Sequence, residues 1–356
     1  MLNLEDKEWK DFRINTLFEV SGTTTTHPSK LIKNGFIPRI TCSSTNNGLD
    51  NIYLNEATES GGVLTVDSAT IGYIAYQQRD FIATDHVEKI FIKDKRINRD
   101  LGLGLVTCIR NSTLNKFNYG YKFSQDRIRK QKIILPINKN KEPDFEYMEE
   151  YSKSIINCKT EKYKQYAQKV LNSIKYKNIE TLENKDWKEF FISGENGLFS
   201  ITSTSSGIDK NKLVFSNNGK IPYITRSDLN NGINLYLENN QIPKYKIDNG
   251  NVITIGLDTQ TVFYQPYSFF TGQNIQILRH NKLNKYNSLF LIPLIKIQMQ
   301  KFNWGGNGAT LGRLSKTKIM LPVNSKDEPD FEYMEQYMKN ITHNKIKQYL
   351  DYLEKS

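Results

Sequence analysis

Residues that usually carry enzymatic chemistry are few in this chain and far apart. The four histidines and three cysteines form no metal-ligand spacing, no CxxC pair and no recognisable nucleophile–base arrangement. They are His27, His86, His280, His343, Cys42, Cys108 and Cys158. We expect the histidines to be surface or loop residues. The odd number of separated cysteines indicates a reducing cytoplasm rather than a disulfide framework.

Two enzymatic motifs can be sought more specifically. A nuclease of the PD…(D/E)xK type could be assembled from Pro143-Asp144 and Asp186-Trp-Lys188, but a helix cap explains Pro-Asp better. An adenine methyltransferase would need a cofactor loop and an (Asn/Asp)-Pro-Pro-(Tyr/Phe) element, and the sequence has neither. The glycine-rich run 305–308 follows no strand of a βαβ unit and lacks a phosphate-binding lysine, so we interpret it as a flexible loop. The sequence therefore predicts no catalytic centre, metal site or cofactor in this chain.

Hydroxyl, amide and guanidinium groups gather instead in three short segments of each half. Such groups read base edges in DNA, while Lys and Arg side chains bind phosphates. The segments are 39–47 with its counterpart 225–231, 118–127 with 303–313, and 85–86 with 273–274. The candidate DNA-binding residues are Arg39, Ser43, Ser44, Asn46, His86, Tyr119, Lys122, Arg127, Arg226, Ser227, Asn230, Gln273, Asn274, Asn303, Trp304, Asn307 and Arg313.

Each of these segments also has a simpler interpretation. The first could be a polar turn without a ligand, the second a packed aromatic residue in a tight turn, and the third the beginning of a strand. In the first segment, Thr41-Cys-Ser-Ser-Thr-Asn-Asn47 aligns with Thr225-Arg-Ser-Asp-Leu-Asn-Asn231. The residues at both ends of this segment repeat, and those at its centre differ. Two homologous domains that read different DNA sequences are expected to differ in this way.

The length and charge fit a two-domain protein with a polyanionic partner. The chain has 356 residues, a formal net charge of +11 and a sequence pI of about 9.2. A basic balance of this size favours nucleic acid, although a lysine-rich solvated surface would also produce it. No signal peptide is recognisable, and the longest apolar run, Leu289–Ile297, is broken by Pro293 and Lys296 and is too short to span a bilayer. We expect a cytoplasmic protein that contacts no membrane.

The elements that must position these segments occur twice. Pro143-Asp-Phe-Glu-Tyr-Met-Glu149 recurs unchanged as Pro329-Asp-Phe-Glu-Tyr-Met-Glu335, and Lys132-Ile-Ile-Leu-Pro136 corresponds to Lys318-Ile-Met-Leu-Pro322. The openings also match, with Trp9-Lys-Asp-Phe12 against Trp187-Lys-Glu-Phe190. A repeat of this length indicates two homologous domains rather than a solenoid.

Each half begins with short β-branched or aromatic runs and ends with a helical period. The runs 63–66, 71–76 and 90–92 predict strands, as do 252–255, 261–264 and 275–278, and short helices are expected near 101–109 and 284–298. Pro143 and Pro329 are placed in the first turns of two long helices, the first of about 35 residues. We predict an α+β fold in which domains 1–142 and 181–328 are β-rich. The helices 143–180 and 329–356 would pair as an antiparallel coiled coil, although each could instead dock on its own domain.

This order resembles the specificity subunits of type I restriction-modification systems over essentially the whole chain. The best local matches are Gly308-Ala-Thr310, Leu314 and Ile319-Met-Leu-Pro322. The first half keeps Ile133-Ile-Leu-Pro136 but has Phe123-Ser-Gln125 in place of the Gly-x-Thr element. The shorter length is closer to the type IIB, BcgI-like branch, and the double proline followed by Glu-Gln of type I proteins is absent. Both branches therefore stay open.

The resemblance implies a non-catalytic specificity subunit whose two target-recognition domains each read one half of a split double-stranded DNA target. The paired helices would set the gap and dock methyltransferase subunits. Cleavage would belong to an endonuclease/translocase or fused restriction-modification subunit, and partners would bind S-adenosylmethionine, Mg and ATP. Rival interpretations are a stand-alone nuclease or methylase, and a duplicated β-domain scaffold or carbohydrate-binding protein. The target bases, spacer length and stoichiometry are not encoded in any motif that we recognise.

Overall fold

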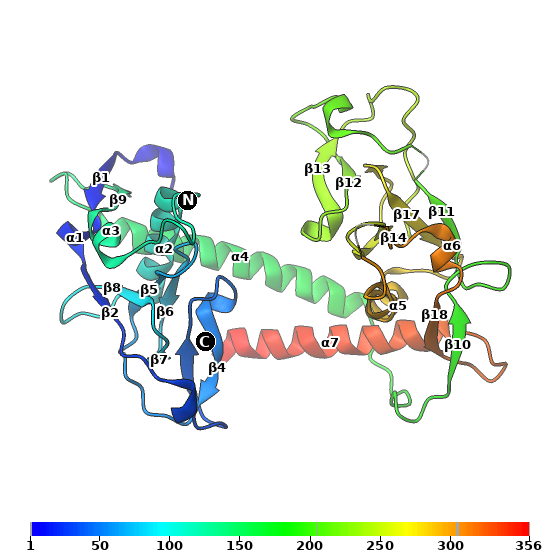
Figure 1. Ribbon diagram of the computed structural model, residues 1–356, viewed down its shortest axis with the longest axis horizontal. Coiled ribbons are helices and arrows are strands. Elements are labelled where there is room, and N and C mark those ends of the chain that lie inside the picture. The colour runs from blue at the N-terminus through cyan, green and yellow to red at the C-terminus, as the bar shows by residue number, and fades with distance from the viewer. Residues whose placement is uncertain (1, 205, 304–305, 356) are drawn as a thin grey trace. The chain divides into compact units, whose positions relative to one another are not determined.

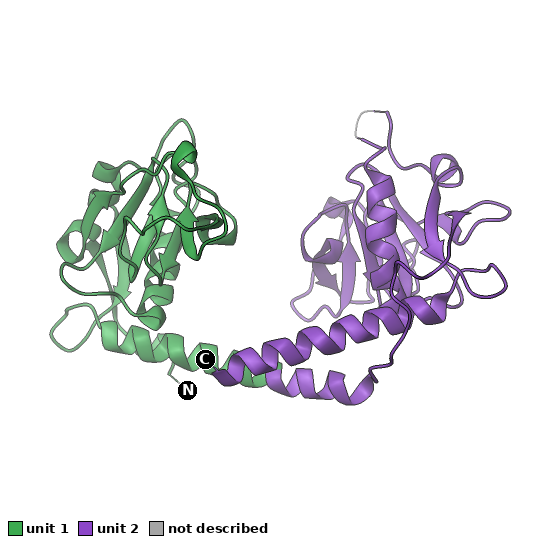
Figure 2. Cartoon of the chain, turned by 90° about the horizontal axis from the view of Figure 1, so that it is seen from below, with its two compact units in different colours: residues 1–163 green, residues 164–356 purple. Residues whose placement is uncertain are grey.

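The computed structural model describes residues 2–204, 206–303 and 306–355. The chain divides into two compact units, residues 1–163 (unit 1) and 164–356 (unit 2), which Figure 2 colours separately. The boundary falls inside the long helix α4, Phe145–Ser173. Each unit is therefore described by itself.

In unit 1, small sheets pack with helices (Figure 1). A four-stranded antiparallel sheet has the order β2-β8-β5-β6, a three-stranded sheet the order β4-β3-β7, and β1 pairs with β9. The strands are β1 Trp9–Arg13, β2 Glu19–Gly22, β3 Ile37–Ile40, β4 Leu49–Tyr53, β5 Val63–Asp67, β6 Ile74–Gln77, β7 Ile82–Ala83, β8 Val87–Phe91 and β9 Lys132–Pro136. The helices are α1 Ile14–Leu17, α2 Arg99–Thr113, α3 Gln125–Lys130 and the start of α4, with 3-10 turns η1 Leu4–Asp6, η2 Pro28–Lys30 and η3 Asn46–Gly48.

Unit 2 repeats this topology strand for strand. Its sheets have the orders β11-β17-β14-β15, β13-β12-β16 and β10-β18. The strands are β10 Trp187–Phe191, β11 Ser200–Ser203, β12 Ile221–Ile224, β13 Ile233–Leu237, β14 Val252–Gly256, β15 Val262–Gln265, β16 Phe270–Thr271, β17 Ile275–Arg279 and β18 Lys318–Pro322. The helices are α5 Lys285–Met299, α6 Leu311–Leu314 and α7 Phe331–Lys355, with η4 Lys210–Lys212 and η5 Asn230–Gly232. The predicted α+β fold with two homologous β-rich domains is confirmed.

The main core of each unit lies between the four-stranded sheet and its packed helix. In unit 1, all five residues of β5 are buried, and Leu105 and Ile109 of α2 are fully enclosed against this sheet. In unit 2, Leu291 and Ile295 of α5 take the same role. A strand covered on both faces needs a continuous apolar run rather than alternation, which explains the valine- and isoleucine-rich segments at these positions. None of the described helices is long and apolar enough to cross a membrane.

The helix starts differ from the sequence prediction by two residues. Pro143 and Pro329 were expected in the first helical turn, but each forms a β-bridge, with Ile137 and Val323 respectively, just before the cap. Asp144 is the residue that caps α4, because its Oδ1 accepts from Tyr147 N at 3.0 Å. The capping interpretation of Pro-Asp is confirmed, and the helices are shorter than expected, at 29 and 25 residues.

Candidate nucleic-acid interface

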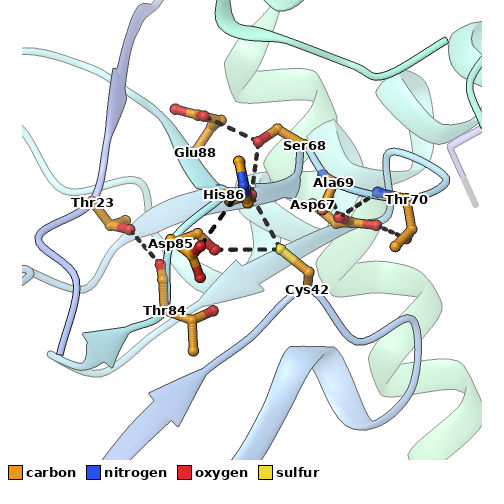
Figure 3. A network of polar contacts seen from close by, with 10 residues as sticks. All are labelled: Thr23, Cys42, Asp67, Ser68, Ala69, Thr70, Thr84, Asp85, His86 and Glu88. Carbon is orange, nitrogen blue, oxygen red and sulfur yellow. Dashed lines mark hydrogen bonds and ion pairs between the residues drawn. The ribbon is translucent and has the colours of Figure 1, made fainter. Parts of the chain in front are cut away.

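In unit 1, the segment after β3 meets the turn before β8. Cys42 Sγ donates to the main-chain oxygens of Asp85, at 3.6 Å, and His86, at 3.2 Å (Figure 3). Ser68, at the start of the β5–β6 connection, donates to the same His86 oxygen through its N–H at 2.9 Å and its hydroxyl at 2.8 Å. Two of the predicted segments therefore lie together, and the connection 68–73 joins them. Its residues 71–73 were expected to begin a strand, which starts instead at Ile74.

The second predicted segment of unit 1 lies against the same connection. A Cβ added to Gly72, which has a φ of +74°, would stand 3.1 Å from the Phe123 ring and 3.5 Å from the Phe117 ring. Arg127 holds the loop in shape, because its Nη1 donates to Lys122 O at 2.6 Å and its guanidinium lies 3.9 Å from the Tyr121 ring centroid. At the tip, the side chain of Tyr119 is 79% exposed. An exposed ring of this kind is available to an external partner.

Unit 2 brings the equivalent segments together through side chains. Asp258, in the β14–β15 connection, forms an ion pair with Arg226, and its Oδ2 accepts from Asn274 Nδ2 at 3.3 Å. The main chain repeats the pattern of unit 1, since Leu257 N donates to Asn274 O at 3.0 Å. Ala309 N in turn donates to Leu257 O at 3.0 Å, which adds the second predicted segment, 303–313, to the cluster.

In unit 2, hydrogen bonds close the described part of the 303–313 segment, whose last residues belong to α6. Asn303 N donates to Asn307 O at 2.9 Å, and Arg313 donates to Gly306 O and Gly308 O, each at 2.9 Å. Arg313 and Arg127 thus stand at equivalent positions and clamp their loops in the same way. Trp304 of this predicted segment lies outside the described residues.

Several predicted contacts have internal partners. Arg39 in β3 is 8% exposed and forms an ion pair with Asp50 at 2.9 Å, so its guanidinium is committed to the fold. The counterpart, Tyr223, is also buried, and its hydroxyl donates to Ile208 O at 2.6 Å. Three other polar residues shape their own turns: Ser43 with Thr45, Ser227 with Leu229, and Asn230 with Ile233. Gln273 Nε2 instead donates to Gly207 O, in a distant segment, at 2.8 Å. Ser44 and Asn46 are exposed on the first loop.

Two buried glutamines that were not among the predicted site residues hold the first loop, one in each unit. Gln77 Nε2 donates to Asn47 O at 3.0 Å and to Thr65 Oγ1 at 2.9 Å. Gln265 Nε2 makes the same pair of bonds, to Asn231 O at 3.0 Å and Thr254 Oγ1 at 3.2 Å. The recurrence of Tyr-Gln at the ends of β6 and β15 is the pattern that could have identified them.

The two Asn-Asn-Gly turns have the same strained backbone. Asn46 and Asn47 have φ of 49° and 54°, and Asn230 and Asn231 have the same values. Asparagine and glycine tolerate the left-handed region, which explains the residue types at this turn. The framework that presents the first loop is therefore the same in both units.

The histidines and cysteines carry no catalytic geometry. Burial, followed by the charge of Asp67, raises the pKa of the Cys42 thiol to about 12, so this group stays protonated. His280 lies in the loop after β17, as expected of a surface or loop residue; it is half-buried and stacks on Phe331 at 4.4 Å between centroids, and burial lowers its pKa. Across residues 2–204, 206–303 and 306–355, no group of three metal-binding side chains is placed to hold an ion.

Two stretches of the chain, residues 6–165 and 184–351, match the family described as type I restriction modification DNA specificity domain. The chain belongs to this family. The specificity subunit of the BcgI type II restriction enzyme from Heyndrickxia coagulans is 28% identical over 344 residues, which are 94% of each chain. The S subunit of a type I restriction-modification system from M. genitalium has the same fold, with a TM-score of 0.52 at 12% identity over 99% of this chain and 94% of that one.

Membership of the specificity-domain family gives the general role of the protein. The protein is a non-catalytic specificity subunit that recognises DNA targets and acts with partners in a restriction-modification complex. The rival interpretations as an independent nuclease, a scaffold or a carbohydrate-binding protein are thereby set aside. The duplicated topology and the two matched stretches describe the same two domains.

Proposed function

We propose that each unit reads one half of a bipartite DNA target through the three loop segments that meet beside the β5–β6 or β14–β15 connection. The observation that carries this proposal is that both units keep the same main-chain bonds at the first and third of these segments but differ in the side chains they present. Ser68 N and Leu257 N donate to the equivalent carbonyls of His86 and Asn274, whose φ values are 61° and 64°. A common framework with different side chains is what two readers of different half-sites require.

The partners would supply the chemistry. We infer that methyltransferase subunits bind S-adenosylmethionine and methylate adenine. An endonuclease/translocase or fused restriction-modification subunit would use Mg and, in a type I arrangement, ATP. The long helices α4 and α7 would pair as an antiparallel coiled coil and set the spacing between half-sites, as the resemblance to specificity subunits implies.

Unit 1 offers a surface suited to a methyltransferase subunit. A groove of about 650 Å³ runs between α2, the start of α4 and the β1–β9 pair, and is lined mainly by apolar side chains. Leu103, Gly104, Cys108, Ile134, Ile155 and Trp9 are among its lining residues. Burial of such a surface in a partner would be favourable, since apolar area removed from water contributes roughly 25 cal/mol per Å².

The equivalent place in unit 2 is filled by the protein itself. Asn98 is the N-cap of α2 and Asn284 is the N-cap of α5. Gly104 and Phe290 follow these caps at the same distance along the helix, so they occupy equivalent positions. The Phe290 ring lies 6.2 Å from the Trp187 ring and 5.5 Å from the Tyr337 ring. A Gly104→Phe variant should fill the groove in unit 1 and weaken methyltransferase binding in a pull-down. Thr107→Ser, which removes only one methyl group from another lining residue, is the control, and unchanged binding of Gly104→Phe would exclude this groove.

Methylome sequencing and co-purification test the proposed function as a whole. A host with this gene should carry one split adenine motif that a deletion strain lacks, and the tagged chain should co-purify with a methyltransferase subunit. Isolation of the chain without such a partner, together with an unchanged methylome, would refute the proposal.

A further inference from the structure

Three of the residues that differ between the two loop clusters are linked by side-chain contacts in unit 2. The alignment of strands makes Arg226 the counterpart of Cys42 and Asn274 the counterpart of His86. Asp258 stands where unit 1 has Ala69, because Leu257 and Ser68 make equivalent main-chain bonds one residue earlier. Unit 2 thus has arginine, aspartate and asparagine where unit 1 has cysteine, alanine and histidine. The bonds from Gln77 to Asn47 O and from Gln265 to Asn231 O are nevertheless the same in both units.

The Asp258 carboxylate links two loops that are distant in sequence. It pairs with the Arg226 guanidinium and accepts from Asn274 Nδ2 at 3.3 Å through the same oxygen, Oδ2. The Arg226 side chain is 41% exposed and that of Asp258 only 18%, so the carboxylate lies beneath the groups that it holds. Unit 1 has an aspartate nearby, Asp67, but its oxygens accept from the turn's own N–H groups at residues 69 and 70.

The donors and acceptors of Arg226 and Asn274 that Asp258 does not engage match the hydrogen-bonding edges of bases. An arginine with one Nη held by a carboxylate still offers parallel N–H donors, the arrangement that binds O6 and N7 of guanine. An asparagine that gives one amide proton to a carboxylate keeps its second N–H and its oxygen, the pair that binds N7 and N6 of adenine. Fixing both side chains before binding reduces the entropy lost on contact.

Resting on the proposed function, we propose that Arg226 and Asn274 are the base-reading residues of unit 2, contacting a guanine and an adenine of its half-site, and that Asp258 is the positioning residue for both. Cys42, Ala69 and His86 are the equivalent positions in unit 1. The Cys42 thiol and His86 ring cannot make these contacts, so the half-site of unit 1 differs at the corresponding base pairs.

Methylation mapping of the assembled complex with single variants tests this assignment. Arg226→Ala should relax selection at one guanine and Asn274→Ala at one adenine, each by roughly 5- to 150-fold, the equivalent of one bidentate contact. Asp258→Asn, which keeps the size but loses the charge, should weaken selection at both positions and leave the other half-site unchanged. A merely structural role would instead lower the yield of complex without changing base preference.

Glu189→Gln provides the matched control, since it removes an exposed ion pair with Lys318, 2.9 Å long, elsewhere in unit 2. It should leave both half-sites intact. A unit 2 half-site without guanine, or an Asp258→Asn profile identical to wild type, would overturn the assignment while the proposed function stands. Absence of any split motif in the wild type would instead overturn the proposed function itself. If Asp258→Asn does not assemble, the two alanine variants decide the question alone.

Discussion

Gln77 and Gln265 provide matched perturbations of the two reading loops. Gln265→Leu keeps the side-chain volume but removes the donor to Asn231 O and Thr254 Oγ1. Thr254 is 2% exposed, so its hydroxyl loses an accepted bond that water cannot easily replace, whereas Asn231 lies in an exposed turn. Leaving one buried acceptor unsatisfied costs about 1–3 kcal/mol, and we expect the loss of stability to lie in this range.

The functional effect should be confined to one half-site. With its carbonyl anchor gone, the Asn-Asn-Gly turn of unit 2 samples more conformations, and a base contact that depends on it loses up to about 1–3 kcal/mol of discrimination. Methylation mapping of Gln265→Leu should reveal a relaxed half-site for unit 2 and an intact one for unit 1. Gln77→Leu should give the mirror result.

Gln241→Leu controls for simple destabilisation. Gln241 is also buried in unit 2 and exchanges bonds with Val214, to O at 2.9 Å and from N at 3.0 Å, but it lies outside the three reading segments. It should lower the melting temperature by about 2–4 °C for each kcal/mol lost, as Gln265→Leu does, without changing base preference. Equal relaxation by Gln241→Leu and Gln265→Leu would refute the idea that the glutamines position a reading loop.

Four further outcomes follow from the same account. Binding of the assembled complex to DNA should weaken with salt, with a slope of log affinity against log salt of about −5 to −9 if six to ten phosphates are contacted; a slope near zero in a titration would count against it. Replacing residues 226–228 by alanine should relax one half-site only, and relaxation of both in methylation mapping would argue against independent reading. Inserting four residues near Lys159 should lengthen α4 by ~6 Å and the preferred spacer by roughly one or two base pairs; an unchanged spacer in an active complex would exclude a ruler. Asp144→Ala should lower the free energy of unfolding by about 0.5–2 kcal/mol through loss of the α4 cap, measured by thermal unfolding. Burial alone would raise the pKa of Asp144, but Lys7 and the Tyr147 N–H hold this pKa below its ordinary value of 3.8. The stabilisation by the Asp144 carboxylate should therefore be present at neutral pH and vanish only as the pH falls below 3.8.

The sequence predicted the elements of the fold well because their causes are local. The runs 63–66 and 252–255 became β5 and β14, and the segments near 101–109 and 284–298 became α2 and α5. Left-handed backbone at both Asn-Asn-Gly turns follows from the residue types alone. The helix starts were displaced because Pro143 and Pro329 complete a bridge, a feature that depends on pairing with distant residues.

The composition of the loop cluster could not be predicted in the same way. Asp258 joins Arg226 and Asn274 only because β14, β12 and β17 bring their ends together, and no spacing in the sequence encodes that meeting. Arg39 looked like a DNA contact because arginine follows a strand, yet strand register turns it inward to Asp50. Residue type identified which loops are polar, and strand pairing decides which of their side chains face outward.

Methylation mapping of a host that carries the complete system, with this gene intact or deleted, tests the central claim most directly. We predict one adenine motif made of two defined half-sites separated by an unspecified spacer of fixed length, present only with the intact gene. A motif that persists after deletion, or a single uninterrupted target, would contradict the conclusion that the two units each read one half of a split sequence.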